Sequence, residues 1–321
     1  APISIIDTDE GLIAFDTGDT KHDGEILQEA IRTVSDKPIR AIIYGHSHTA
    51  FGAGVLAEGQ EDVQVIGHPN LNAVVEANAK AAGFPAYFPE IGPYLTARGL
   101  IQFNAFMPKE GPDAWVVPTT FPEDFELAYL PVNTPVEDGQ ELTVLGQKMQ
   151  FFTKYGSDDK VHTTVWLPDR EILFTTLLWS SPPQLYSVRG DVFRDPREWI
   201  EGLKFNRDLE PEVLISAAAK PVVGKEAVRK RLEGYLDGAS FVLDQTLRGI
   251  LGGKRPDELR HLVRLPEYLR EVPNNLESYG EVSSYPPAIY FLSVGWSDTD
   301  AANLAPVPPL EEATRMVPLM G

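Results

Sequence analysis

The sequence predicts an α/β fold with a helical extension at its C-terminal end. Three observations support this: strand-like runs alternate with helical periodicity in the first 82 residues, β-rich runs return between residues 141 and 178, and helical spacing of apolar residues dominates beyond Lys225. The chain has 321 residues, of which 43% are hydrophobic. This is enough material for one large domain or two ordinary ones.

Each element of the first part follows from a local pattern. Two short β-rich runs around a glycine turn predict a hairpin, and apolar residues spaced three and four apart predict amphipathic helices. The predicted strands are 3–6, 12–15, 39–44 and 63–66, and the predicted helices are 23–34 and 70–82. Strand 39–44 is expected to be parallel to its neighbours.

The second part begins with a segment rich in proline and glycine. Residues 84–139 have weak periodicity, which predicts a loop-rich excursion or lid. Four β-rich runs follow, the last two joined by a Pro-Asp-Arg turn, and then another strand and a long helical region. The predicted strands are 141–145, 150–155, 162–167, 172–178 and 212–219. We therefore divide the chain at residue 224, with a helical extension over 225–321.

Composition excludes several classes of protein. The absence of cysteine rules out disulfides, thiolate metal sites and cysteine nucleophiles, so any metal must be held by histidine or carboxylate. The net charge of −19 argues against nucleic-acid binding, and no apolar run is long enough for a membrane span. A soluble protein is expected, and the sequence leaves the cytoplasm and export to the periplasm or medium open.

The strongest chemical signal is Tyr-Gly-His-Ser-His-Thr at 44–49, where a predicted strand ends. Imidazoles at positions i and i+2 can point to one side and chelate one ion, and functional sites gather at the carboxyl ends of parallel strands. Two loop histidines bonded to the backbone would show the same spacing. The sequence thus predicts a metal site at His46 and His48, with a structural role as the alternative.

The order of these motifs resembles the start of the metallo-β-lactamase fold, and later segments resemble the alkyl sulfatases. The segments are Leu-Tyr-Ser-Val-Arg-Gly at 185–190, Asp-Gln-Thr-Leu at 244–247, Tyr-Gly-Glu-Val-Ser at 279–283 and Gly-Trp-Ser-Asp-Thr-Asp at 295–300. The resemblance covers nearly the whole chain. It implies an αββα sandwich that begins inside the fold, with residues 311–321 leading into a missing dimerisation domain.

The resemblance also implies a metal site that is only half retained. Members of that family bind two zinc ions through His-x-His-x-Asp-His and further ligands. The positions that match the first ion are His46, His48 and Asp158, whereas the others are occupied by Ala50, Phe51, Thr176 and Ala218. Two readings follow: one catalytic zinc ion on two histidines and one carboxylate, or a pocket that has lost its metal.

Further site residues are predicted around this centre. We expect catalytic roles for His48, Asp158 and His162, because imidazole and carboxylate groups serve as acids and bases. His68, at the end of strand 63–66, is a second candidate for completing the site. Arg189 and Arg98 match arginine-bearing stretches of the family and would bind sulfate, with Tyr186 among the aromatic residues expected along an apolar substrate channel. For each of these, an ordinary core position or salt bridge is the alternative.

The leading functional hypothesis is an alkyl-sulfatase-like hydrolase acting on an anionic substrate with an apolar part. One alternative is a metal-independent lyase, dehydratase or isomerase of a specialised pathway. Another is a non-catalytic subunit whose apolar helical segment 225–272 docks onto another chain. A homo-oligomer, or a second chain that completes the fold, is the expected partner.

Overall fold

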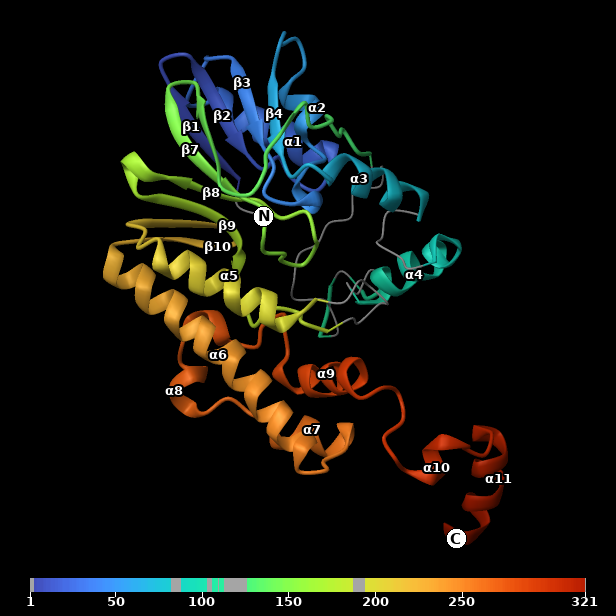
Figure 1. The fold of residues 1–321 in the computed structure, drawn as a ribbon. Helices are drawn as coiled ribbons and strands as arrows, with labels where there is room; N and C mark the ends of the chain where they lie inside the picture. The colour runs from blue at the N-terminus through green and yellow to red at the C-terminus, as the bar shows by residue number, and fades with distance from the viewer. Residues whose placement is uncertain are drawn as a thin grey trace.

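Two five-stranded sheets stacked face to face form the centre of the protein, and helices cover both outer faces (Figure 1). The structure is a computed structural model that describes residues 3–81, 88–102, 106–108, 110–112, 126–186 and 194–320. The order of layers, helix, sheet, sheet and helix, is the predicted αββα sandwich, and further helices form the C-terminal extension.

The first sheet has the strand order β1-β2-β3-β4-β5. Its strands are β1 (Ser4–Thr8), β2 (Gly11–Phe15), β3 (Ile39–Ile43), β4 (Gln64–Gly67) and β5 (Thr134–Pro135). The hairpin β1–β2 is antiparallel, and every later pair is parallel. The carboxyl ends of β2, β3 and β4 therefore share one edge of the sheet, where residues 16, 46 and 68 follow.

The second sheet has the order β10-β9-β8-β7-β6. Its strands are β6 (Gln140–Val144), β7 (Gln147–Phe152), β8 (Thr164–Leu167), β9 (Ile172–Trp179) and β10 (Val213–Val223). Neighbours from β6 to β9 are antiparallel, and β10 runs parallel to β9. The predicted hairpin β8–β9 is confirmed, with its turn at Pro168–Arg170.

Helices fall into two groups and an arm. Helices α1 (Lys21–Arg32), α2 (Ala53–Leu56) and α3 (Leu71–Lys80) lie on the first sheet, with α4 (Gly92–Gln102) beyond them. Helices α5 (Pro196–Asp208) and α6 (Lys225–Leu251) cover the second sheet, and α7 (Pro256–Leu262), α8 (Glu267–Arg270) and α9 (Tyr285–Ser293) pack on α6. Helices α10 (Ala301–Leu304) and α11 (Pro309–Met320) form an arm that projects from the body (Figure 1).

Successive side chains of a strand point to opposite faces of its sheet, and this produces three clusters of buried hydrophobic residues. One lies between the two sheets, and the other two lie between each sheet and its helices. On β2, Leu12 and Ala14 pack against helices, while Ile13 and Phe15 face the other sheet. On the second sheet, Phe174 of β9 faces inward and Leu173 packs under α5 and α6. Because both faces of β2 are covered, all five of its residues are buried, as expected for a strand inside a layered α/β fold.

The structure contains helices that the sequence patterns do not predict. Helix α5 is absent from the predicted elements, although Asp195 caps it and Pro196 opens it, a typical helix start. The segment predicted to be loop-rich contains α4, packed through Gly92 against the end of α3. Among the described residues, no helix is both long and apolar enough to cross a membrane.

Candidate metal centre

Two loops from different sheets bring the candidate ligands together. His46 immediately precedes a short 3-10 turn, Ser47–Thr49, and His48 lies within it. This turn follows the end of β3. Asp158 lies on the loop between β7 and β8. The two loops are joined by a backbone hydrogen bond of 2.7 Å from Thr163 N to the Gly45 carbonyl. The site therefore lies where the two sheets meet, at the carboxyl edge of the first.

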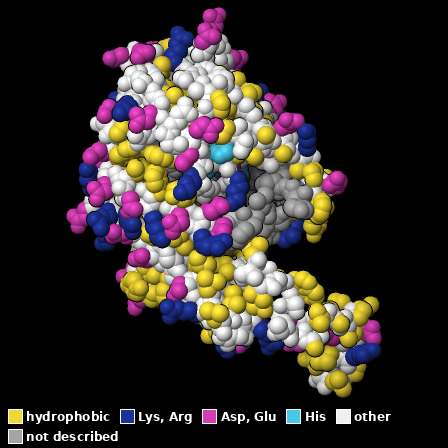
Figure 2. Space-filling view, viewed as in Figure 1, with side chains coloured by type: hydrophobic (Ala, Val, Ile, Leu, Met, Phe, Trp, Pro, Cys, Tyr) yellow, Lys and Arg dark blue, Asp and Glu magenta, His cyan; other side chains and the backbone are white. Residues whose placement is uncertain are grey.

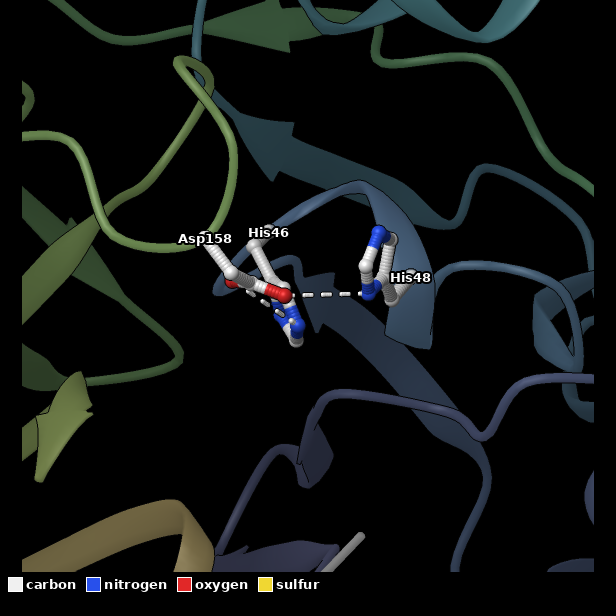
Figure 3. Close-up of side chains that lie close together, drawn as sticks. All are labelled: His46, His48 and Asp158. Atoms are coloured by element: carbon white, nitrogen blue, oxygen red, sulfur yellow. Dashed lines mark ion pairs between the residues drawn. The ribbon is translucent and has the colours of Figure 1, made fainter. Parts of the chain in front are cut away.

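The three side chains point toward one another (Figure 3). His48 Nδ1 is 3.1 Å from Asp158 Oδ2, and His46 Nε2 is 3.8 Å from Asp158 Oδ1. One ligand atom from each residue lies within 4.8 Å of the others. His46 and Asp158 are buried and His48 is partly exposed, so the cluster is open on the His48 side.

His46 is oriented by a chain of hydrogen bonds. Thr49 Oγ1 donates to Asp16 Oδ1 over 2.6 Å. Because its proton is used in this bond, Thr49 Oγ1 can accept a hydrogen bond from His46 Nδ1, which is 3.2 Å away. This arrangement lets His46 donate from Nδ1 to Thr49 and places Nε2 on the side of Asp158. Asp16 also accepts from Gly45 N at 2.8 Å, and a Cβ at Gly45 would lie 3.0 Å from its other oxygen.

Asp158 is held from both sides. Ser157 Oγ donates to its Oδ1, and Arg194 Nε donates to its backbone carbonyl, both over 3.0 Å. Arg194 is buried and also bonds the Gln184 carbonyl. The sequence does not predict Asp16, Thr49 and Arg194 as site residues, because their hydrogen bonds to the backbone and to the candidate ligands produce no sequence motif. Only the position of Asp16 at the end of a strand gives a signal.

Charge within the cluster favours a cation. Burial alone would lower the pKa of His48, but Asp158, Asp159 and Asp19 raise it to about 9. Burial would raise the pKa of Asp158, and the two imidazoles outweigh it, so the pKa lies well below its usual value. The carboxylate is thus ionised at neutral pH and attracts either a proton on the imidazoles or a metal ion.

The other histidines occupy different settings. His162 is buried with both ring nitrogens engaged: Nδ1 donates to the Tyr155 carbonyl at 2.6 Å, and Nε2 accepts from Thr176 N at 3.3 Å. Burial lowers its pKa to about 4, so it is neutral, and proton transfer would require one of these bonds to break. His68 accepts from Asn70 N through Nδ1 and does not belong to the three-residue cluster found among the described residues.

The residues predicted to bind substrate do not belong to the three-residue cluster, and one of them lies outside the described residues. Arg98 is on the exposed side of α4. Tyr186 is part-buried, stacks edge-on against Tyr285, and accepts from Glu281 N. Arg189 and the side chain of Ala218 lie outside the described residues.

The positions where the resemblance implied a second ion carry no charged or imidazole ligand. Ala50 is fully buried in the core under the first sheet, and the ring of Phe51 lies 6.1 Å from that of Tyr129. Thr176 is buried, and its hydroxyl has no hydrogen-bond partner among the described residues. The described donors therefore suit one ion better than two.

Comparisons with known proteins point in one direction. A family model described as alkyl sulfatase dimerisation matches residues 255–321. A linear primary-alkylsulfatase from Pseudomonas sp. (strain ATCC 19151) is 31% identical over 331 residues, covering 99% of this chain and 60% of that enzyme. An (R)-specific secondary-alkylsulfatase from Pseudomonas sp. is 27% identical, covering 100% of this chain and 49% of that enzyme.

Solved structures agree with the fold. A stereoselective inverting sec-alkylsulfatase from Pseudomonas sp. superposes with a TM-score of 0.81 at 26% identity, covering 99% of this chain and 51% of that one. A metallo-β-lactamase family protein from Thermus thermophilus gives a TM-score of 0.54 at 17% identity, covering 84% of this chain and 85% of that one. The chain spans half to three-fifths of the curated relatives it matches.

Proposed function

The chain is homologous to the alkylsulfatases and has the metallo-β-lactamase fold, and we propose on this basis that it is the core of a hydrolase of sulfate esters. The observation that carries the proposal is the cluster of His46, His48 and Asp158 at the carboxyl edge of the first sheet. In the reaction, a sulfate ester R–O–SO₃⁻ and water give the alcohol ROH and hydrogen sulfate.

The donor set fits a single zinc ion. His46 Nε2, His48 Nδ1 and a carboxylate oxygen of Asp158 would hold it, since imidazole nitrogen and carboxylate oxygen are ordinary zinc ligands and each is already aimed at the others. Held by these three residues, a zinc ion would supply the chemistry of a metal-activated water, whose pKa it would lower toward 7. The bond from His46 Nδ1 to Thr49 is the kind of outer contact that zinc-binding histidines make.

Other residues of the chain are proposed to orient the ligands and to bind the substrate. Asp16 and Thr49 keep His46 in one orientation, and Arg194 keeps the Asp158 backbone in place. Because the protein is strongly acidic, an anionic substrate needs local positive charge, and we propose Arg189 and Arg98 for the sulfate group. Tyr186 and neighbouring aromatic residues are proposed to face the apolar part of the substrate.

Zinc uptake and sulfate release together test the proposal. The purified protein is expected to bind about one zinc ion per chain and to release sulfate from a medium-chain alkyl sulfate, measured by ion chromatography. His48→Ala is expected to reduce both by at least about tenfold. His22→Ala is the matched control, because His22 is exposed and pairs with Glu25 near the surface.

Each contrary outcome has a clear meaning. Sulfate release that survives complete chelation would favour a metal-independent enzyme, and zinc binding without turnover of any sulfate ester would rule out the proposed substrate class. Failure to bind zinc, manganese or iron in the native protein would remove the metal site altogether.

We also propose that the partner is a second copy of the chain. The matching family model is described as a dimerisation segment, and it includes the arm formed by α10 and α11. Every residue from 301 to 320 is exposed, and Figure 2 shows hydrophobic side chains gathered over the arm. A pairing of arms would cover this apolar surface.

A further inference from the structure

Asp159, the neighbour of Asp158, makes an unusual set of contacts across the site. Its Oδ2 accepts from both the backbone N and the hydroxyl of Ser47, at 2.9 and 2.5 Å. Its Oδ1 accepts from Val161 N at 2.9 Å. One carboxylate therefore ties the turn that carries both histidines to the loop that carries Asp158.

The position of Ser47 makes this contact important. Ser47 stands between His46 and His48, is buried, and belongs to the first-sheet side of the site, whereas Asp159 belongs to the second-sheet side. The two sheets are separate hydrogen-bonded units, so their relative position at the site depends on such cross-links. Apart from this carboxylate, the backbone bond from Thr163 to Gly45 makes a similar connection.

We propose that Asp159 is a positioning residue that fixes the distance between the histidine pair and Asp158. The inference rests on the proposed metal-binding function and deepens it. Metal ligands must sit within a few tenths of an ångström of their ideal places, so a hydrogen-bonded strap between the ligand loops sets affinity without touching the ion. Asp159 bonds the protein, not the substrate, and is not a catalytic residue.

Asp159→Asn is the direct test. Asparagine keeps the shape, but its NH2 group replaces one of the two acceptor oxygens, so the bonds from Ser47 and from Val161 cannot both be kept. Loss of such an outer contact typically lowers metal affinity by about 10- to 100-fold, and we expect this drop for zinc, measured by competition with a chromogenic chelator. In the zinc-free protein, the backbone amide that loses its acceptor, that of Ser47 or that of Val161, should also exchange hydrogen faster.

Asp138→Asn is the matched control. Asp138 Oδ1 also accepts two backbone N–H groups, those of Thr153 and Lys154 at the β7 end of the loop that carries Asp158, but these bonds do not reach the histidine turn. The substitution removes the same charge and the same kind of cap. Zinc affinity in Asp138→Asn is expected to stay within about twofold of the native protein, since its two bonds do not join the loop of Asp158 to the histidine turn.

Ser47→Ala separates geometry from charge. It removes the hydroxyl bond while leaving the Asp159 charge in place, and we expect a roughly three- to tenfold loss of zinc affinity. Combined with Asp159→Asn, it should add little, because both variants remove the same strap. This variant also decides the question if Asp159→Asn does not fold.

Two results would overturn the inference: native zinc affinity in both Asp159→Asn and Ser47→Ala, or unchanged exchange of the Ser47 and Val161 amides in Asp159→Asn. If the native protein binds no zinc, the metal part of the proposed function fails, and the exchange measurement alone decides whether Asp159 joins the two loops.

Discussion

The body of the protein and its C-terminal arm are stabilised in opposite ways. In the body, strands such as β2 are buried along their whole length, and one oxygen of Asp16 at the site accepts hydrogen bonds from Gly45 and Thr49. In the arm, α10 and α11 are exposed throughout, with Leu310 81% and Leu319 80% exposed. An isolated helix of 12 residues is marginal in water. The body therefore contains its own hydrophobic core, whereas the arm has none among the described residues.

The largest expected effect is in the body. Trp199 of α5 is fully buried under the second sheet, and its Nε1 donates to the Leu177 carbonyl. Trp199→Ala should lower the free energy of unfolding by about 3–5 kcal/mol, because it opens a large cavity and leaves a carbonyl without its donor. Urea denaturation followed by circular dichroism measures this. A change below about 1 kcal/mol would contradict the account of a self-sufficient core.

The pH dependence of stability tests how firmly a buried histidine of the body is held in its neutral form. His162 is neutral when folded, with a pKa of about 4, against about 6.5 when unfolded. The unfolded chain therefore binds the extra proton between these values, so this stability is complete above about pH 6.5 and is lost as pH falls toward about 4.

The loss from His162 is expected to be about 3 kcal/mol at most. Measuring unfolding at several pH values for the native protein and for His162→Gln isolates it, because the glutamine does not titrate. The difference in unfolding free energy between the two should shrink as pH falls from about 6.5 to about 4. A difference that is constant with pH would show that the histidine is not held neutral.

The arm should respond in association rather than in folding. Leu310→Ala is expected to leave body stability unchanged and to weaken self-association by about ten- to hundredfold, the effect of removing roughly 1.5–3 kcal/mol of apolar burial at an interface. Analytical ultracentrifugation over a range of concentrations measures it. Val34→Ala serves as control, since Val34 is 82% exposed on the body. Equal effects of the two variants would remove the distinction between arm and body.

The smallest effect concerns the support of His46. Thr49→Val removes the hydroxyl between Asp16 and His46 while keeping the side-chain shape. Zinc affinity is expected to fall about tenfold through lost orientation of the ring. Thr33→Val is the control, because the Thr33 hydroxyl bonds the end of α1, far from the site. Unchanged affinity in Thr49→Val would mean that the ring is held by packing alone.

Much of the fold could be predicted because most strands carry their own signal. The short apolar runs of β2, β3 and β4 and the hairpin β8–β9 are visible in the sequence. Strand β5 has two residues, Thr134–Pro135, and pairs only because the chain returns beside β4. Helix α4 is hard to predict because its packing face is built on Gly92, Leu95 and Gly99, which carries little apolar periodicity.

The site was predictable only in part, for a related reason. His46 and His48 are close in sequence and share a strand end, so their pairing can be read directly. Asp158 could be placed only by resemblance to a family, because its partners lie on another sheet. The role of Asp159 could not be predicted, because accepting bonds from the backbone of Ser47 depends on the three-dimensional meeting of two loops.

That meeting of loops also governs when the site can exist during synthesis. Ser47 and Asp159 are 112 positions apart in the chain, so bringing them together closes a very long loop. The first sheet can begin to form while the ribosome is still making the second, but the histidine turn then has no opposing carboxylates. Under the proposed function, metal capture would consequently be a late event in the life of the nascent chain, because synthesis that stops before Asp158 leaves the two histidines without this carboxylate.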